Sequence, residues 1–137
     1  MKLYHGTSTE NWNEIMKKGL IEPYLTSEIE LAEYYADCEV DEAGGGPLIL
    51  EVHVNEDVLR VDLNALAEPV TFGHYKGCLS ELEDLVQETD DELAEEHPEW
   101  LEGDIIDIPE NEYRVSLDTV ASCWADETIP YEYLTAL

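Results

Sequence analysis

The alternation of apolar and polar positions predicts a strand followed by a helix at the start of the chain. A short apolar run at 3–4 predicts a strand that ends at the pair His5-Gly6. A glycine at a strand end lets another group approach the main chain closely. Beyond the pair, apolar residues recur at helical spacing until Gly19, where we expect the helix to stop.

Two capping boxes predict where the first two helices begin. Thr7 and Glu10 have the spacing of such a box, and so do Ser27 and Glu30. Between the two helices, 24–26 has the composition of a short strand.

The second helix carries two adjacent tyrosines that face in different directions. Leu31, Ala32 and Ala36 recur at helical spacing, which places Tyr35 on the inward stripe and Tyr34 off it. We therefore expect Tyr35 to face the interior of the protein.

The middle of the chain predicts strands and then a long polar helix. Alternation over 48–54 predicts a strand, and 58–63 predicts a shorter one. We expect 69–77 to be an irregular loop and 79–100 to be helical. In the strand predicted at 48–54, we expect Leu50, Val52 and Val54 to face the core.

The last third of the chain returns to strand-like patterns. We predict strands at 105–108, 113–117 and 120–124, with a turn at Asp118-Thr119. A final short element at 129–134 is expected to cover a sheet edge. The whole pattern predicts one α+β domain over 1–137, with an acidic helical insertion at about 79–102.

Charge is the outlying property of the composition. The 137 residues include 34 acidic and 6 basic ones, which gives a formal net charge of −28. Proteins bind phosphate backbones through Lys and Arg, so we expect no direct nucleic-acid binding. The acidity is compatible with a need for solubility or a salty cytoplasm, with attraction to a basic protein partner, or with imitation of a nucleic acid.

The cysteines and the hydropathy indicate neither a metal site nor a membrane span. Cys38, Cys78 and Cys123 are far apart and show no metal-ligand spacing. The start of the chain lacks the pattern of a signal peptide, and no apolar run reaches the length of a membrane helix. We expect a soluble cytoplasmic protein without a bound metal.

Three short motifs carry a resemblance to a known family. His5-Gly6-Thr7 is similar to the first motif of the ADP-ribosyltransferase superfamily, in its histidine-containing branch of diphtheria toxin and the poly(ADP-ribose) polymerases. Tyr24, followed by Ser27 and by a helix that carries Tyr35 eleven positions on, resembles the second motif.

The resemblance implies an NAD-binding cleft within a split two-sheet core. It implies that His5 holds the nicotinamide ribose and that the main chain of Gly6 holds the carboxamide. It further implies that Tyr24 and Tyr35 sandwich the nicotinamide ring, with Ser27 near its amide. NAD would be a substrate, and mono-ADP-ribosylation of a protein target would be the reaction.

The third motif of the family is an acid on a late strand, and three carboxylates compete for this role. The acid stabilises the positive charge that develops on the ribose as nicotinamide leaves. The context of Glu112 resembles that of the polymerases, and we rank it first. Asp118, at the expected hairpin tip, and Asp126, three residues before Ile129, are the alternatives.

Several groups could donate hydrogen bonds or positive charge to the pyrophosphate of NAD, and the sequence does not select one of them. The available groups are Thr7, Ser8, Thr9, the main-chain N–H groups that open the first helix, Lys17 and Arg60.

A second hypothesis keeps the fold and abandons the catalysis. In it, the acidic surface blocks a basic nucleic-acid-binding protein, as small acidic phage inhibitors do. Some anti-CRISPR proteins are ADP-ribosyltransferases, so a viral counter-defence role is compatible with both hypotheses. RNA 2′-phosphotransfer on the same fold needs arginines to hold the phosphate, and this chain is short of basic residues.

Overall fold

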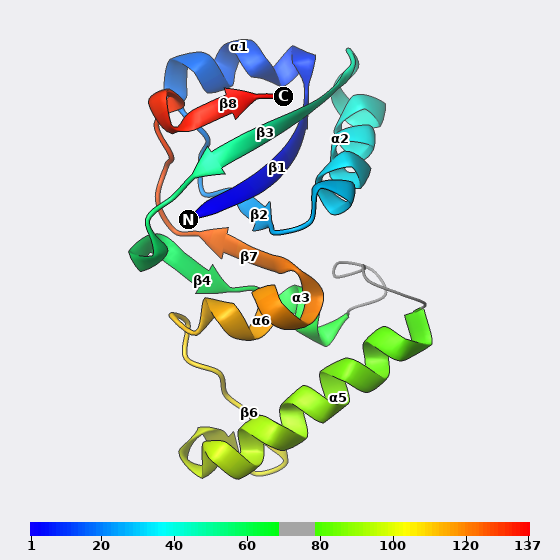
Figure 1. The fold of residues 1–137 in the computed structure, drawn as a ribbon, viewed down its shortest axis with the longest axis vertical. Helices are drawn as coiled ribbons and strands as arrows, with labels where there is room; N and C mark the ends of the chain where they lie inside the picture. The colour runs from blue at the N-terminus through cyan, green and yellow to red at the C-terminus, as the bar shows by residue number, and fades with distance from the viewer. Residues whose placement is uncertain (69–78) are drawn as a thin grey trace.

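The computed structural model describes residues 1–68 and 79–137, and within them six antiparallel strands form one sheet (Figure 1). The α+β class predicted from the sequence is confirmed. In spatial order the strands are β4 (Leu59–Val61), β7 (Ser122–Ala125), β2 (Tyr24–Thr26), β1 (Lys2–Ser8), β3 (Pro47–His53) and β8 (Leu134–Ala136).

The sheet has a weak seam in its middle, between β1 and β2. Every residue of β1 pairs with β3, whereas β1 pairs with β2 through Tyr4 and Thr26 alone. The six strands therefore divide into two three-stranded halves that share one residue pair. The two separate sheets that we expected are instead hydrogen-bonded into one, with the division at this seam.

The two faces of the sheet are covered differently. Leu3, Leu50 and Val52 lie in a core cluster with Ile15 of helix α1 (Thr9–Lys18). Helix α2 (Ile29–Ala43) packs on the other face, across β1 and β3. Leu50, Val52 and Val54 are buried as predicted, and α1 stops at Gly19 as predicted.

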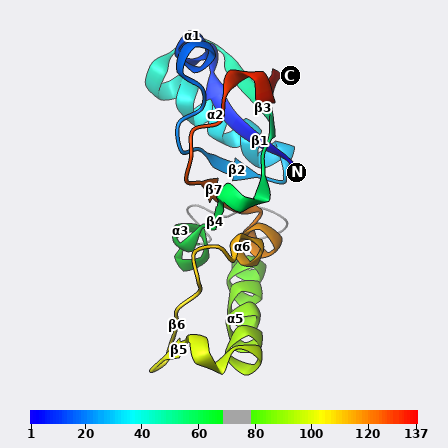
Figure 2. The same cartoon turned by 90° about the vertical axis from the view of Figure 1, so that its left-hand side faces the viewer.

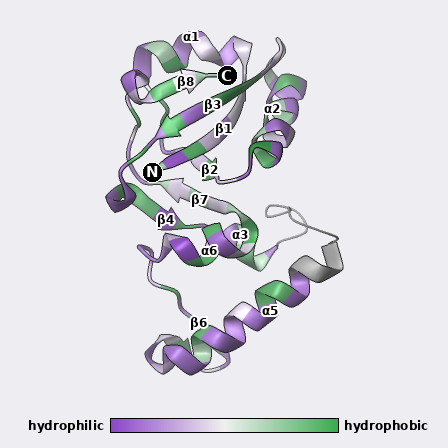
Figure 3. Ribbon diagram, in the orientation of Figure 1, coloured by the Kyte–Doolittle hydropathy of each residue, from purple (hydrophilic) through white to green (hydrophobic). Residues whose placement is uncertain are grey.

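Helices α3 (Leu63–Ala67) and α6 (Tyr113–Val120) lie against the β4 half, and the acidic helix α5 (Leu79–Glu96) extends beyond them (Figures 1 and 2). A second core cluster links α5 to the rest through Val86 and Leu93. Most of α5 is hydrophilic in Figure 3, which agrees with the long polar helix predicted at 79–100, although α5 ends at Glu96.

The chain leaves α5 through short elements. The turn η2 (Pro98–Trp100) leads into a two-stranded hairpin of β5 (Leu101–Glu102) and β6 (Ile105–Ile106). The strand predicted at 105–108 is therefore only two residues long.

Elsewhere, the turn η1 (Glu56–Val58) precedes β4, and η3 (Tyr131–Tyr133) precedes β8. Strand β8 pairs with β3 at the sheet edge, but it shares only Leu134 with the element that we predicted at 129–134, so the edge is covered mainly by the residues that follow that element.

Three predictions of local structure are wrong. His5 and Gly6 lie inside β1 and do not end a strand. The predicted capping boxes do not form. The residues that precede α1 and α2 are Ser8 and Glu28, each one position after the predicted cap, and the side chain of neither makes a capping hydrogen bond. The segment 113–117, predicted as a strand with a turn after it, belongs to α6.

The final predicted strand is displaced as well, since β7 begins at Ser122 and not at 120. The loop predicted at 69–77 lies outside the described residues. Among the helices of the described residues, none combines the length and the apolar character that crossing a membrane would require.

Candidate functional site

A pocket of about 290 Å³ opens at the seam between β1 and β2, beneath α2. Its lining comes from both halves of the sheet, from α2 and from the segment that follows β4. The lining residues are Tyr4, His5 and Gly6 of β1, Tyr24, Leu25 and Thr26 of β2, Tyr35 and Glu39 of α2, Asp62 and Asn64 after β4, and Ser122 of β7.

The register of β1 explains why main-chain groups face this pocket. Met1 exchanges hydrogen bonds with Val54. Because hydrogen-bonded positions alternate along an antiparallel pair of strands, every second residue counted from Met1 directs its N–H and C=O groups to β3. Tyr4 and Gly6 then direct theirs to the β2 side. Tyr4 is paired there, but the strands separate before a Gly6–Tyr24 pair can form. The N–H and C=O of Gly6 are therefore directed into the seam.

His5 bridges the separated strands. Its Nδ1 lies 2.8 Å from the main-chain oxygen of Tyr24, and because a carbonyl only accepts, Nδ1 carries the proton of this bond. Burial lowers the pKa of His5, although the Tyr24 carbonyl and the Glu39 carboxylate oppose this shift. The ring is thus neutral at pH 7, and Nε2 is an acceptor.

Gly6 is required by the packing of α2. A Cβ at this position would lie 1.9 Å from the main-chain oxygen of Ala32 and 2.7 Å from the nitrogen of Ala36. The close approach that we expected at Gly6 is therefore made by a helix. This contact also sets the height of α2 above the sheet, and so the depth of the pocket.

Tyr24 and Tyr35 both line the pocket, from a strand and from a helix respectively. Tyr24 is 52% exposed, whereas Tyr35 is partly buried and Tyr34 beside it points outward, as the helical pattern predicted. Burial, with Asp62 nearby, raises the pKa of Tyr35 to about 12, so its hydroxyl keeps its proton at pH 7. Two aromatic rings are thus available to flat ligands.

Asp62 is the buried carboxylate of the pocket, and the sequence did not reveal it. It is 4% exposed; Ser122 Oγ donates to its Oδ2 at 2.5 Å and the Ala65 N–H to its Oδ1 at 3.0 Å. Its own N–H donates to Ser116 Oγ at 2.9 Å. The one signal in the sequence is its place as the cap of α3, which is an ordinary structural role.

Glu39 is the second carboxylate of the lining, on the same side of α2 as Tyr35. Asn11 Nδ2 donates to its Oε2 at 3.1 Å and to Thr7 Oγ1 at 3.2 Å. This chain of bonds connects α1, β1 and α2 beside His5.

Several residues predicted for the site lie elsewhere. Thr7 is buried and bonded to Asn11, and Ser27 is exposed; neither lines the pocket. Glu112 precedes α6 and Asp118 lies exposed within it, so neither stands on a late strand or in the lining. The late strand β7 brings Ser122 to the pocket in their place.

Asp126 is occupied by an ion pair. Its Oδ2 lies 2.8 Å from Nη2 of Arg60, so the alternative acid and one of the possible pyrophosphate donors neutralise each other.

Comparison with protein-family models, with curated proteins and with solved structures finds no match to this chain.

Proposed function

We propose that this protein is an NAD-dependent mono-ADP-ribosyltransferase that modifies a protein target. The observation that carries the proposal is the meeting of His5, Gly6, Tyr24 and Tyr35 in one pocket, although they are dispersed over the first 35 positions of the sequence.

The pocket suits the nicotinamide half of NAD. Its volume of about 290 Å³ is at the small end of ligand sites, so it holds a part of a dinucleotide while the rest stays outside. Tyr24 and Tyr35 stack on the flat ring, and the main-chain N–H and C=O of Gly6 bind the carboxamide in both directions. The neutral His5 accepts a hydrogen bond from a ribose hydroxyl at Nε2.

Asp62 replaces Glu112 and Asp118 as the acid in this proposal. In NAD the positive charge lies on the pyridine ring, and as the bond to ribose C1′ breaks it moves to the ribose. A fixed, buried carboxylate beside C1′ stabilises the transition state more than the ground state. The donors Ser122 and Ala65 keep Asp62 oriented before NAD arrives.

The local charge also favours this cofactor. Glu39 and Asp62 present negative charge to the cationic pyridine ring. The distant carboxylates of α5 repel the pyrophosphate only weakly, because physiological salt screens charges beyond about 8 Å.

Incubation with NAD labelled in its adenine, together with candidate proteins or a lysate, tests the proposal. The expected result is label on a protein and stoichiometric release of nicotinamide. The proposal is overturned if calorimetry detects no binding at millimolar NAD and no nicotinamide is released.

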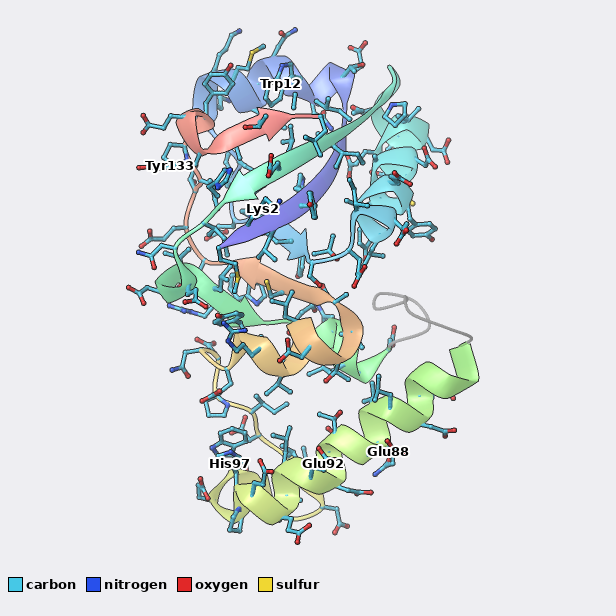
Figure 4. All side chains as sticks on the ribbon, in the orientation of Figure 1. Lys2, Trp12, Glu88, Glu92, His97 and Tyr133 are labelled. Carbon is cyan, nitrogen blue, oxygen red and sulfur yellow. The ribbon has the colours of Figure 1, made fainter. Side chains whose placement is uncertain are left out.

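The acidic inhibitor remains the second candidate, and the position of α5 favours it. The helix lies at one end of the molecule, beyond the six-stranded sheet, and Glu88 and Glu92 project from it (Figure 4). Such a surface fits a protein partner with a basic face. This candidate predicts that the protein displaces DNA from a basic DNA-binding protein without NAD, and that Asp62→Asn displaces it equally well.

A further inference from the structure

A second pocket adjoins the first on the same face of the sheet. It has a volume of about 250 Å³ and shares Tyr24, Asp62 and Asn64 with the seam pocket. Any group bound in it therefore lies beside the carboxylate that we assign to the ribosyl cation.

The floor of the second pocket is a row of side chains across three strands. Tyr24 pairs with Trp124, and Trp124 pairs with Arg60, so the three side chains lie on one face. The indole N–H of Trp124 donates to the oxygen of Val61 at 3.0 Å, which fixes the ring. Two aromatic side chains thus lie side by side between the seam pocket and Arg60.

The charge that the second pocket offers to a ligand is negative, because the one cationic side chain among its described lining residues is engaged in internal contacts. Nη1 of Arg60 donates to the main-chain oxygens of Asp57 and Leu59, at 2.9 and 2.8 Å, and Nη2 is paired with Asp126. The guanidinium therefore serves internal contacts. Asp62 and the exposed Glu110 supply the remaining charge.

We propose that the second pocket binds the acceptor of the transfer, and that this acceptor is an arginine side chain of the target protein. The proposal rests on the function proposed above. Tyr24 and Trp124 favour a planar cation through cation–π contact, and two carboxylates with the Asn64 amide match its several N–H donors. A lysine ammonium is compact and strongly hydrated, so it uses this arrangement less well.

The transfer then proceeds between the two pockets. The C1′–N bond of NAD breaks, and its electron pair stays on nicotinamide, which leaves as a neutral molecule. A guanidinium nitrogen forms the new bond to C1′ and loses one proton to Asp62 or Glu110, from which the proton passes to water. The products are nicotinamide, ADP-ribosyl-arginine and H⁺.

Binding of two small probes of equal charge tests the acceptor site. The probes are the Nα-acetyl methylamides of arginine and of lysine, titrated by NMR at about 150 mM salt to screen non-specific attraction. We expect the arginine probe to bind about tenfold more tightly and to shift the Trp124 indole signal. Glu110→Gln is expected to weaken it by about three- to tenfold, and Trp124→Leu by about tenfold.

Glu132→Gln is the matched control, because Glu132 is also exposed but lies on η3, outside the second pocket. Equal weakening by Glu132→Gln and Glu110→Gln, or equal binding of both probes, overturns the inference. If nicotinamide is released but the arginine probe does not bind, the transferase stands without this acceptor. If the probe binds but nicotinamide is never released, the acceptor site stands as a guanidinium site and the proposed transferase fails.

Discussion

The Nδ1 atom of His5 donates a hydrogen bond to the main-chain oxygen of Tyr24 at the point where β1 and β2 stop pairing. A continued ladder would have placed the Gly6 N–H at this oxygen. The imidazole takes over that bond, so the strands separate without leaving the Tyr24 carbonyl unpaired. The seam and the pocket therefore depend on a side chain that is both structural and open to a ligand.

The lowered pKa of His5 predicts a pH-dependent loss of stability. Folding favours the neutral ring, so the full contribution of His5 is present above its ordinary pKa of 6.5 and is lost as the pH falls toward the lowered value. His5→Gln, whose amide can still donate to Tyr24 but does not titrate, removes this dependence. Urea unfolding of both proteins between about pH 7.5 and 5 measures it.

The expected result is that the wild type loses stability relative to His5→Gln as the pH falls. The comparison is needed because the many carboxylates of the chain also titrate toward the acid end of this range. A constant difference between the two proteins would contradict the prediction.

Gly6→Ala is expected to destabilise the fold strongly. The new Cβ meets the main chain of Ala32 and Ala36, which cannot rotate away as a side chain could. Separation of α2 from β1 should cost about 3 kcal/mol of unfolding free energy. Gly46→Ala is the control, because a Cβ there meets only Thr9 Cγ2 at 4.0 Å, and it should change stability by less than about 0.5 kcal/mol. Equal effects in urea unfolding would refute the packing argument.

The first half of the fold followed from the sequence because its patterns are local. The helix stop at Gly19, the inward Tyr35 and the buried alternation of Leu50 and Val52 each depend on neighbours within a few residues. The capping boxes failed because Thr7 continues β1 and α1 starts two residues later. Spacing alone cannot distinguish a cap from the end of a strand.

The C-terminal third was predicted poorly because its pattern is ambiguous. In 113–117, apolar residues at every second position match a strand, but α6 buries Tyr113, Ser116, Leu117 and Val120, which is a helical spacing. The buried serine accepts a bond from the Asp62 N–H and so belongs to the inward face. A polar residue in the core concealed the helix.

The carboxylate that we propose as the acid of the site was not predicted, for a related reason. Asp62 is held at the pocket by hydrogen bonds with Ser122 and Ser116, which lie more than 50 positions away along the chain. Among 34 acidic residues, only the tertiary fold distinguishes it from the others. Glu112, in contrast, resembled a family motif in a segment that proved to be helical.

The stacking role that we propose for Tyr35 predicts a clear difference between two substitutions. Its phenol, with a pKa of about 12, contributes a neutral ring at pH 7. Tyr35→Phe keeps the ring and should bind NAD within about twofold of the wild type, whereas Tyr35→Ala should weaken binding about tenfold. Calorimetry with NAD measures both. Tyr133→Ala, a half-exposed tyrosine on η3 outside the pocket, should have no effect.

Replacement of Asp90 on α5 by an uncharged residue is expected to stabilise the fold. Burial and the neighbouring Asp91 raise its pKa, so the folded state holds this proton more tightly than the unfolded state does. The charged carboxylate is thus unfavourable at neutral pH, and the penalty fades as the pH falls through the raised pKa toward 3.8. Asp90→Asn should raise the Tm at pH 7 and lose this advantage near pH 4. Glu88→Gln controls for the charge removed from the helix, and an equal gain in Tm would show that position 90 is not special.

Asp62 and Glu112 make the decisive pair of variants for the chemistry. Asp62→Asn keeps the size of the side chain but removes the negative charge that we propose lies beside the ribose, so nicotinamide release should fall by about a hundredfold or more while NAD still binds. Glu112→Gln, on a residue outside the pocket, should release nicotinamide at the wild-type rate. Single-turnover release and calorimetry separate the chemical step from binding. If Glu112→Gln is inactive and Asp62→Asn is not, the pocket does not form the reacting centre, and the acid of this protein is the one that the sequence alone indicated.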